Sequence, residues 1–144
     1  MFKNIVIPID LTDNHLWDEI IATALNIIDT NSGRIHLVNI IPELGINFLE
    51  DYLPQEWIEK RKAEAIVAIQ KLITNYIPQE IEVQHFVTKG AVSEEVLSYA
   101  EQVKANLIIV TSTKGYPKDH SPGPNAKKIT KHAQTSVLVL RVNQ

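Results

Sequence analysis

The chain has 144 residues, a formal net charge of −3, 44% hydrophobic residues and 22% charged residues, as expected for a single globular domain over residues 1–144. It has no cysteine, which excludes disulfides and thiol chemistry, and no apolar run approaches the ~18 residues of a membrane span. The mild acidity disfavours a general nucleic-acid binder. The N-terminus lacks the basic and apolar regions of a signal peptide, so we expect a cytoplasmic protein with neither membrane nor nucleic acid as a partner.

Strand and helix patterns alternate from the start of the chain. The apolar run Ile5–Ile9 is typical of a strand covered on both faces, and helical spacing follows from Leu16 to Ile28. Gly33 stands where this helix is expected to end, and Ile35–Ile41 is a second apolar strand. Three residues that favour helix N-caps precede the helix: Thr12, Asp13 and Asn14.

The alternation continues to the end of the chain. Pro54 suits the start of a long helix that Pro78 stops, and Ile81–Val87 alternates like a third strand. Ser93 is expected to cap the third helix. The last three elements are predicted to be a strand at Leu107–Val110, a helix at Pro124–Ala133 and a strand at Val137–Val142.

Five strands separated by helices indicate an α/β fold in three layers, with an open parallel sheet and right-handed crossovers. Such sheets bind ligands beyond the carboxyl ends of their strands, where the strand order reverses. Asp10 follows the first strand, where its carboxylate could accept hydrogen bonds from a ribose hydroxyl or a base amino group. The alternative is that Asp10 bonds only to backbone amides at the start of the next helix.

The second notable loop, Thr111–Gly123, follows the fourth strand and has 13 residues. Its hydroxyls, lysines and glycine amides could cradle a polyphosphate at the start of the helix that follows. No P-loop or Rossmann motif occurs, and a solvated loop is the alternative. The segment after Val110 is strongly basic, because it has a single acidic residue, Asp119. Its six basic residues are Lys114, Lys118, Lys127, Lys128, Lys131 and Arg141.

Several stretches resemble the universal stress protein (UspA-like) family, in its small single-domain form. They are MFKNIVIPIDLT, IHLVNIIP, TKGAVSEEVLSYA, ANLIIVTS and PGPNAKKITKHAQTSVLVLRV, and together they span nearly the whole chain. The resemblance implies a Rossmann-like, adenine nucleotide α-hydrolase-like fold with sheet order 3-2-1-4-5 and four helices. It also implies a cytoplasmic stress-response protein that binds ATP or ADP. Whether Mg²⁺ binds together with the nucleotide is left open.

The resemblance also implies a set of nucleotide-binding residues. Asp10 would face the ribose or adenine, and Ile40 would offer backbone contacts to the base. Together with residues taken from the local sequence, such as the lysines of the basic segment, the complete set of predicted nucleotide-binding residues is Pro8, Asp10, Ile40, Thr111, Ser112, Thr113, Gly115, Lys118, Gly123, Asn125 and Lys127.

Two departures weigh against nucleotide binding. The first two glycines of the family's phosphate motif are missing at their usual spacing, and Pro124 replaces the serine or threonine that follows the last one. Proline supplies neither a hydroxyl nor a backbone N–H, although it suits the first position of a helix. A dimeric interaction module that works without nucleotide, with a degenerate phosphate loop, is therefore the alternative function.

Catalysis and metal binding are not expected. No nucleophile-elbow motif occurs, and apart from His120 no general base is evident beside the phosphate loop, so weak ATP turnover is the most that is expected. The histidines have no i, i+4 pair, so no metal site is predicted.

The last strand is apolar on both sides and ends the chain, which favours a homodimer. Its predicted contacts are Val137, Leu138, Val139, Leu140 and Val142.

Overall fold

The computed structural model describes residues 1–11, 17–42, 54–112 and 122–141. The predicted caps at 12–14 and the predicted site or dimer residues Thr113, Gly115, Lys118 and Val142 lie outside these ranges. The elements are β1 (Asn4–Pro8), α1 (Trp17–Ile27), β2 (Arg34–Pro42), α3 (Gln55–Tyr76), β3 (Glu82–Gly90), α4 (Val92–Gln102), β4 (Leu107–Ser112), α5 (Pro124–His132) and β5 (Ser136–Arg141).

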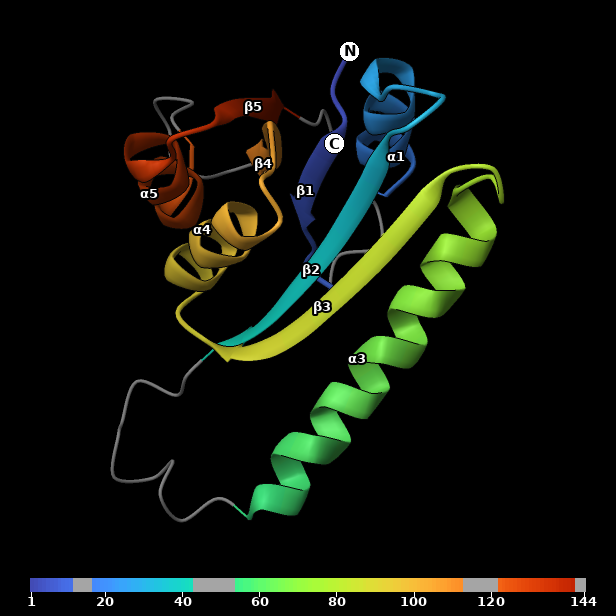
Figure 1. Ribbon diagram of the computed structural model, residues 1–144. Helices are drawn as coiled ribbons and strands as arrows, with labels where there is room; N and C mark the ends of the chain where they lie inside the picture. The colour runs from blue at the N-terminus through green and yellow to red at the C-terminus, as the bar shows by residue number, and fades with distance from the viewer. Residues whose placement is uncertain (12–16, 43–53, 113–121, 142–144) are drawn as a thin grey trace.

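All five strands form one parallel sheet in the order β3-β2-β1-β4-β5, which confirms the predicted topology. Figure 1 shows α1 and α3 on one side of the sheet and α4 and α5 on the other. The three-layer α/β architecture is therefore as predicted. Within the described ranges, no helix combines the length and apolarity that crossing a membrane requires.

The central strands β1, β2 and β4 are buried on both faces, and their alternation divides the core in two. Ile5 and Ile7 of β1 point toward α1 and α3, whereas Val6 between them points toward α4 and α5. All three side chains are at most 1% exposed. Burying each contributes roughly 1.5–3 kcal/mol, which explains why the central strands are nearly continuous apolar runs.

Two strands run further than the sequence pattern indicates. β3 continues to Gly90 because its ladder with β2 extends to the pair Pro42↔Gly90. β4 continues to Ser112, and Thr111 and Ser112 pair with β5. The prediction that the loop begins at Thr111 was therefore wrong, because backbone pairing with β5 extends the strand into polar sequence.

The predicted N-cap at Ser93 was also wrong. Ala91 is the N-cap of α4, and Ser93 is buried inside the first turn. Gly90 has φ +158°, and a Cβ there would lie 2.8 Å from Cγ of Glu95. Because Gly90 has no side chain, the chain can turn directly from β3 into α4 at this position. The helix therefore begins before Ser93, the residue predicted to cap it.

Gly33 does not end α1, which stops at Ile27. The carboxylate of Asp29 accepts hydrogen bonds from the backbone N–H groups of Asn31 and Ser32, at 2.9 and 3.2 Å, and these bonds lower its pKa. The proline boundaries are confirmed. Pro54 is the N-cap of α3 and Pro124 is the first residue of α5.

Candidate functional site

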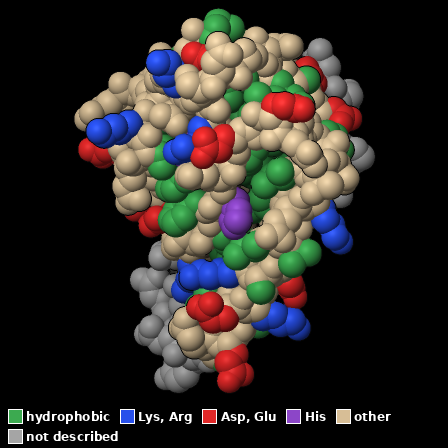
Figure 2. All heavy atoms as spheres, turned by 45° about the vertical axis from the view of Figure 1, so that its right-hand side comes forward, with side chains coloured by type: hydrophobic (Ala, Val, Ile, Leu, Met, Phe, Trp, Pro, Cys, Tyr) green, Lys and Arg blue, Asp and Glu red, His purple; other side chains and the backbone are tan. Residues whose placement is uncertain are grey.

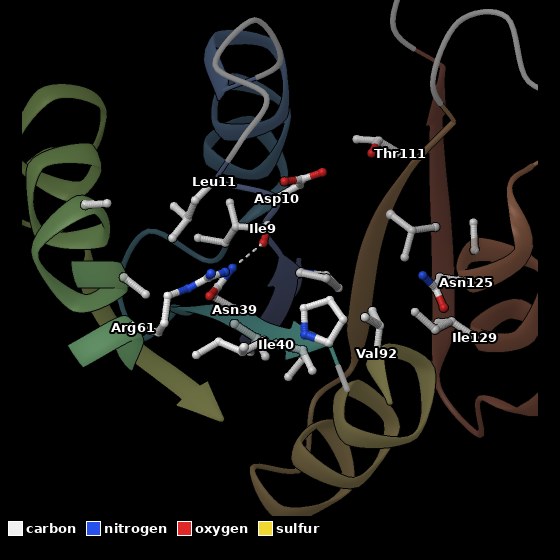
Figure 3. A pocket seen from close by; sticks show the side chains of 18 of the residues that line it. Ile9, Asp10, Leu11, Asn39, Ile40, Arg61, Val92, Thr111, Asn125 and Ile129 are labelled. Atoms are coloured by element: carbon white, nitrogen blue, oxygen red, sulfur yellow. Dashed lines mark hydrogen bonds between the residues drawn. The ribbon is translucent and has the colours of Figure 1, made fainter. Parts of the chain in front are cut away.

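The sheet opens into a cavity of ≈ 810 Å³ at the carboxyl ends of β1, β2 and β4. Its floor comes from these strand ends, and its walls come from α3, α4 and α5 (Figure 3). The lining combines apolar side chains with a few polar groups, as is typical of small-molecule sites.

The strand connections explain why the cavity forms here. β1 pairs with β2 over five residue pairs but with β4 over only two, Ile5↔Leu107 and Val6↔Ile108. The chain then leaves β1 for α1 on one face and leaves β4 for α5 on the other. Connections that diverge to opposite faces leave a crevice between the two strand ends, where open parallel sheets bind their ligands.

Five of the residues predicted to bind nucleotide line this cavity: Pro8, Asp10, Ile40, Thr111 and Asn125. Figure 3 shows Asp10 from the β1 side and Thr111 from the β4 side near the top of the cavity, with Asn125 on the α5 side. They come from four different elements or their ends, so the fold assembles groups that are up to 117 positions apart in the sequence.

Three predicted residues are described but do not line the cavity. Ser112 is buried, because strand alternation turns its side chain to the face opposite Thr111. Gly123 is the N-cap of α5 and Lys127 is an exposed residue of the same helix, with the Lys127 N–H donating to the Gly123 carbonyl at 2.9 Å. The backbone of Gly123 therefore begins the helix that forms this wall.

The N-terminus of α5 borders the cavity. Asn125 and Ala126, in the first turn of this helix, both line it. The amide groups of a first turn have no partner within the helix and carry a partial positive charge, which favours an anion. Pro124 removes one of these donors, and no side chain caps the helix. This end of the cavity is therefore suited to an anion but has one donor fewer than an ordinary helix start.

The wall formed by α3 was missed at the sequence level. Arg61, Glu64, Ala65 and Ala68 lie on one face of the helix, because they are spaced by three, four and seven residues, and they all line the cavity. The available signal was the pair of small residues Ala65 and Ala68 beside the bulky Ile66 and Ile69 of the same helix. Figure 3 shows Arg61 pointing from α3 toward Asn39.

Asn39 was also missed, although a polar residue inside an apolar strand is a recognisable signal. Its side-chain amide donates a hydrogen bond from Nδ2 to the carbonyl of Ile9 at 3.0 Å. This bond ties the end of β2 to the end of β1 and orients Asn39 at the cavity.

The described lining carries three ionisable groups, the side chains of Asp10, Arg61 and Glu64. In the part of the chain that the structure describes, no cluster of three or more His, Asp or Glu residues is placed to hold a metal ion. The chemistry that these groups offer is hydrogen bonding and charge recognition around a largely apolar floor.

The model of the universal stress protein family matches residues 1–141. The chain belongs to this family. Universal stress protein G of Escherichia coli O157:H7 is 26% identical over 143 residues, which cover 98% of this chain and 100% of that protein. The family resemblance noted from the sequence is thus confirmed, whereas the division into one domain over 1–144 stays a prediction.

Solved structures of universal stress proteins share the fold. UspA from Lactobacillus plantarum is 20% identical, with a TM-score of 0.67 over 96% of this chain and 97% of that one. An Arabidopsis thaliana family protein with AMP bound is 13% identical, with a TM-score of 0.65 over 98% of this chain and 92% of that one. A universal stress protein in complex with cAMP is 16% identical, with a TM-score of 0.61 over 99% and 98%.

Proposed function

We propose that this universal stress protein binds an adenine nucleotide, ATP or ADP, in the cavity at the ends of β1 and β4. The observation that carries the proposal is the position of Asp10 and Thr111. They face one cavity from β1 and β4, the two strands whose following connections diverge to opposite faces of the sheet. The volume of ≈ 810 Å³ lies within the range of roughly 300–1,000 Å³ that is usual for small-molecule sites. The AMP and cAMP complexes of two structural neighbours add support.

The groups at the cavity suggest how the nucleotide lies. The first turn of α5, at Asn125, suits the phosphates because its free amides and partial positive charge favour anions. Asp10 and Thr111 would then meet the ribose, and Ile40 at the end of β2 would lie at the base. Any Mg²⁺ entering with a polyphosphate would be held mainly by the phosphate oxygens.

We infer a regulatory role rather than efficient catalysis. Efficient phosphoryl transfer needs several groups that stabilise charge around the transferred phosphate. The described phosphate end offers the first turn of α5, where Pro124 contributes no N–H. A nucleotide that binds without rapid turnover can act as a signal by stabilising one conformation of its protein.

We also propose a homodimer that forms through β5. This strand is at the edge of the sheet and pairs with β4 on one side only. Val137, Leu138, Val139 and Leu140 are only half-buried, although all four are apolar. Pairing with a second copy would satisfy the open backbone edge and cover this apolar surface.

The test of nucleotide binding is calorimetry with ATP, ADP and AMP on protein that has been freed of ligand by unfolding and refolding. Asp10→Asn is expected to weaken binding about tenfold, because a charged acceptor for a ribose hydroxyl is replaced by a neutral one, and hydrogen bonds to charged groups are stronger. Asp18→Asn is the matched control, since Asp18 is an exposed acid on α1 outside the cavity. Absence of binding at millimolar nucleotide would contradict the proposal and favour an interaction module that works without nucleotide.

A further inference from the structure

The first half of α3 adds little to the core. α3 has 22 residues, and its buried residues, Ala65, Ile69 and Leu72, begin only at the end of its first half. None of the described residues 55–64 is buried. Figure 1 shows this half extending past the carboxyl ends of β2 and β3. In Figure 2 the same lower end of the molecule carries charged side chains of both signs. Core packing therefore does not explain why the helix is so long.

What the first half does provide is Arg61 at the cavity. The guanidinium of Arg61 lies over the ring of Trp57 one turn earlier, 5.1 Å from its centroid. This cation–π contact limits the rotamers of a long side chain, so Arg61 is oriented before any ligand arrives. Trp57 itself is 38% exposed, which is unusual for tryptophan and agrees with a role in holding Arg61 rather than in the core.

Arg61 and the first turn of α5 stand at opposite ends of the cavity. α3 packs against β2 and β3, whereas α5 packs against β4 and β5. Figure 3 shows Arg61 beside Asn39 and Ile40 on one side and Asn125 on the other. Glu64, one turn after Arg61, lines the cavity at the same end. A phosphate at that end would meet the carboxylate of Glu64, which makes it a poor place for an anion.

We propose that Arg61 contacts the nucleobase of the bound nucleotide and determines the affinity for it, an inference that rests on the proposed function. A planar guanidinium can either lie over the π face of a purine or approach its edge and donate to its ring nitrogens. Asn39, fixed by its bond to Ile9, and the backbone of Ile40 form the rest of this end of the site. The phosphates occupy the α5 end.

The test compares adenosine, AMP and ATP binding to the wild type and to Arg61→Ala, Arg61→Lys and Lys60→Ala. If Arg61 contacts the base, Arg61→Ala weakens all three ligands by the same factor, about tenfold. Arg61→Lys restores little of the lost affinity, because lysine keeps the positive charge but lacks the planar guanidinium group. Lys60→Ala, a neighbouring exposed cation outside the cavity, leaves binding unchanged. Trp57→Ala produces a smaller loss than Arg61→Ala, because only the orientation of Arg61 is relaxed.

Two results overturn the inference and leave the proposed function standing. One is wild-type binding that Arg61→Ala does not change. The other is a loss confined to AMP and ATP that Arg61→Lys restores, which would assign Arg61 to phosphate. A wild type that binds none of the three ligands contradicts the proposed function itself and the inference with it. Equal unfolding free energies of the wild type and the variants show that the losses are local, as expected for an exposed side chain.

Discussion

The Nδ1 nitrogen of His36 lies 3.0 Å from the hydroxyl of Tyr99, which joins the middle of β2 to α4 inside the core. The other ring nitrogen, Nε2, is 3.2 Å from Oδ1 of Asn4 on β1. A carbonyl oxygen can only accept, so Nε2 carries the proton and Nδ1 accepts from the Tyr99 hydroxyl. Phe86 of β3 stacks on the Tyr99 ring at 4.6 Å. Every polar atom of the neutral imidazole thus has a partner, and the protonated form would disturb this arrangement.

The first prediction concerns the pH dependence of stability. Burial, followed by the nearby charge of Arg34, lowers the pKa of His36 from 6.5 to about 4. Because the folded pKa is below the unfolded one, the unfolded chain binds more protons between these values. His36 therefore costs no stability above pH 6.5 and reduces the free energy of unfolding as the pH falls toward 4, by on the order of 3 kcal/mol in full.

Urea unfolding of the wild type and of His36→Gln from pH 7 to pH 4 checks this prediction. The variant is expected to be less stable at pH 7, by about 1 kcal/mol or more for the disturbed hydrogen bonds, and to lose less stability on acidification. His132→Gln, at an exposed position of α5, serves as the control. Parallel pH profiles of the wild type and His36→Gln would show that His36 does not cause the acid sensitivity.

The second prediction concerns Gly33, where the neighbouring atoms leave no room for a side chain. A Cβ at this position would lie 2.3 Å from the carbonyl oxygen of Asp29 and 2.3 Å from Cγ1 of Ile28. The Asp29 carbonyl is held by the Gly33 N–H at 2.7 Å, so it cannot move away freely. Gly33→Ala is expected to lower the free energy of unfolding by about 1–3 kcal/mol. Ser32→Ala, next to it and exposed, should change it by less than about 0.5 kcal/mol.

The third prediction concerns Lys104, which has φ 56° just after α4. The helix ends in a Schellman motif, with the Ala105 N–H donating to the Ala100 carbonyl at 2.9 Å and the Lys104 N–H to Glu101 at 3.2 Å. Glycine adopts this left-handed conformation without the steric cost that a side chain carries. Lys104→Gly should therefore stabilise the protein by about 0.5–1 kcal/mol. Lys104→Ala keeps a Cβ, and therefore the steric cost, and should not stabilise the protein. Equal melting temperatures for both variants would contradict this explanation.

The fourth prediction concerns the phosphate end of the proposed site. Pro124→Ser restores a backbone N–H and adds a hydroxyl at the first position of α5. If phosphates bind there, ATP affinity should rise about tenfold or more, since one hydrogen bond to a charged group contributes roughly 1.5–3 kcal/mol. Adenosine affinity should stay the same. Calorimetry with both ligands measures the difference, and an unchanged ATP affinity would place the phosphates elsewhere.

The fifth prediction concerns assembly. Val139→Lys puts a charge in the middle of the β5 edge, where the proposed dimer would bury it. We expect a monomer in analytical ultracentrifugation, whereas the wild type sediments as a dimer. Gln134→Lys, which adds the same charge at an exposed position outside the strand, should leave the dimer intact. A monomeric wild type would rule out the dimer.

Local sequence patterns were enough to predict the order of strands and helices. Apolar runs such as Ile5–Ile9 and the prolines at 54, 78 and 124 act locally, because burial on both faces and the missing N–H of proline restrict a segment whatever surrounds it. The family resemblance was equally local, carried by short stretches, and it led correctly to the sheet order and to the side-by-side placement of Asp10 and Thr111 at one cavity.

Tertiary packing determines which other groups reach the cavity and where several elements begin or end. Arg61 lines the site because α3 continues past the sheet, and no local pattern shows on which neighbour a helix face will pack. The side chain of Ser112 points away from the cavity because pairing with β5 makes it a strand residue. Such contacts join residues from separate elements, so their energies appear only when the packed chain brings the partners together.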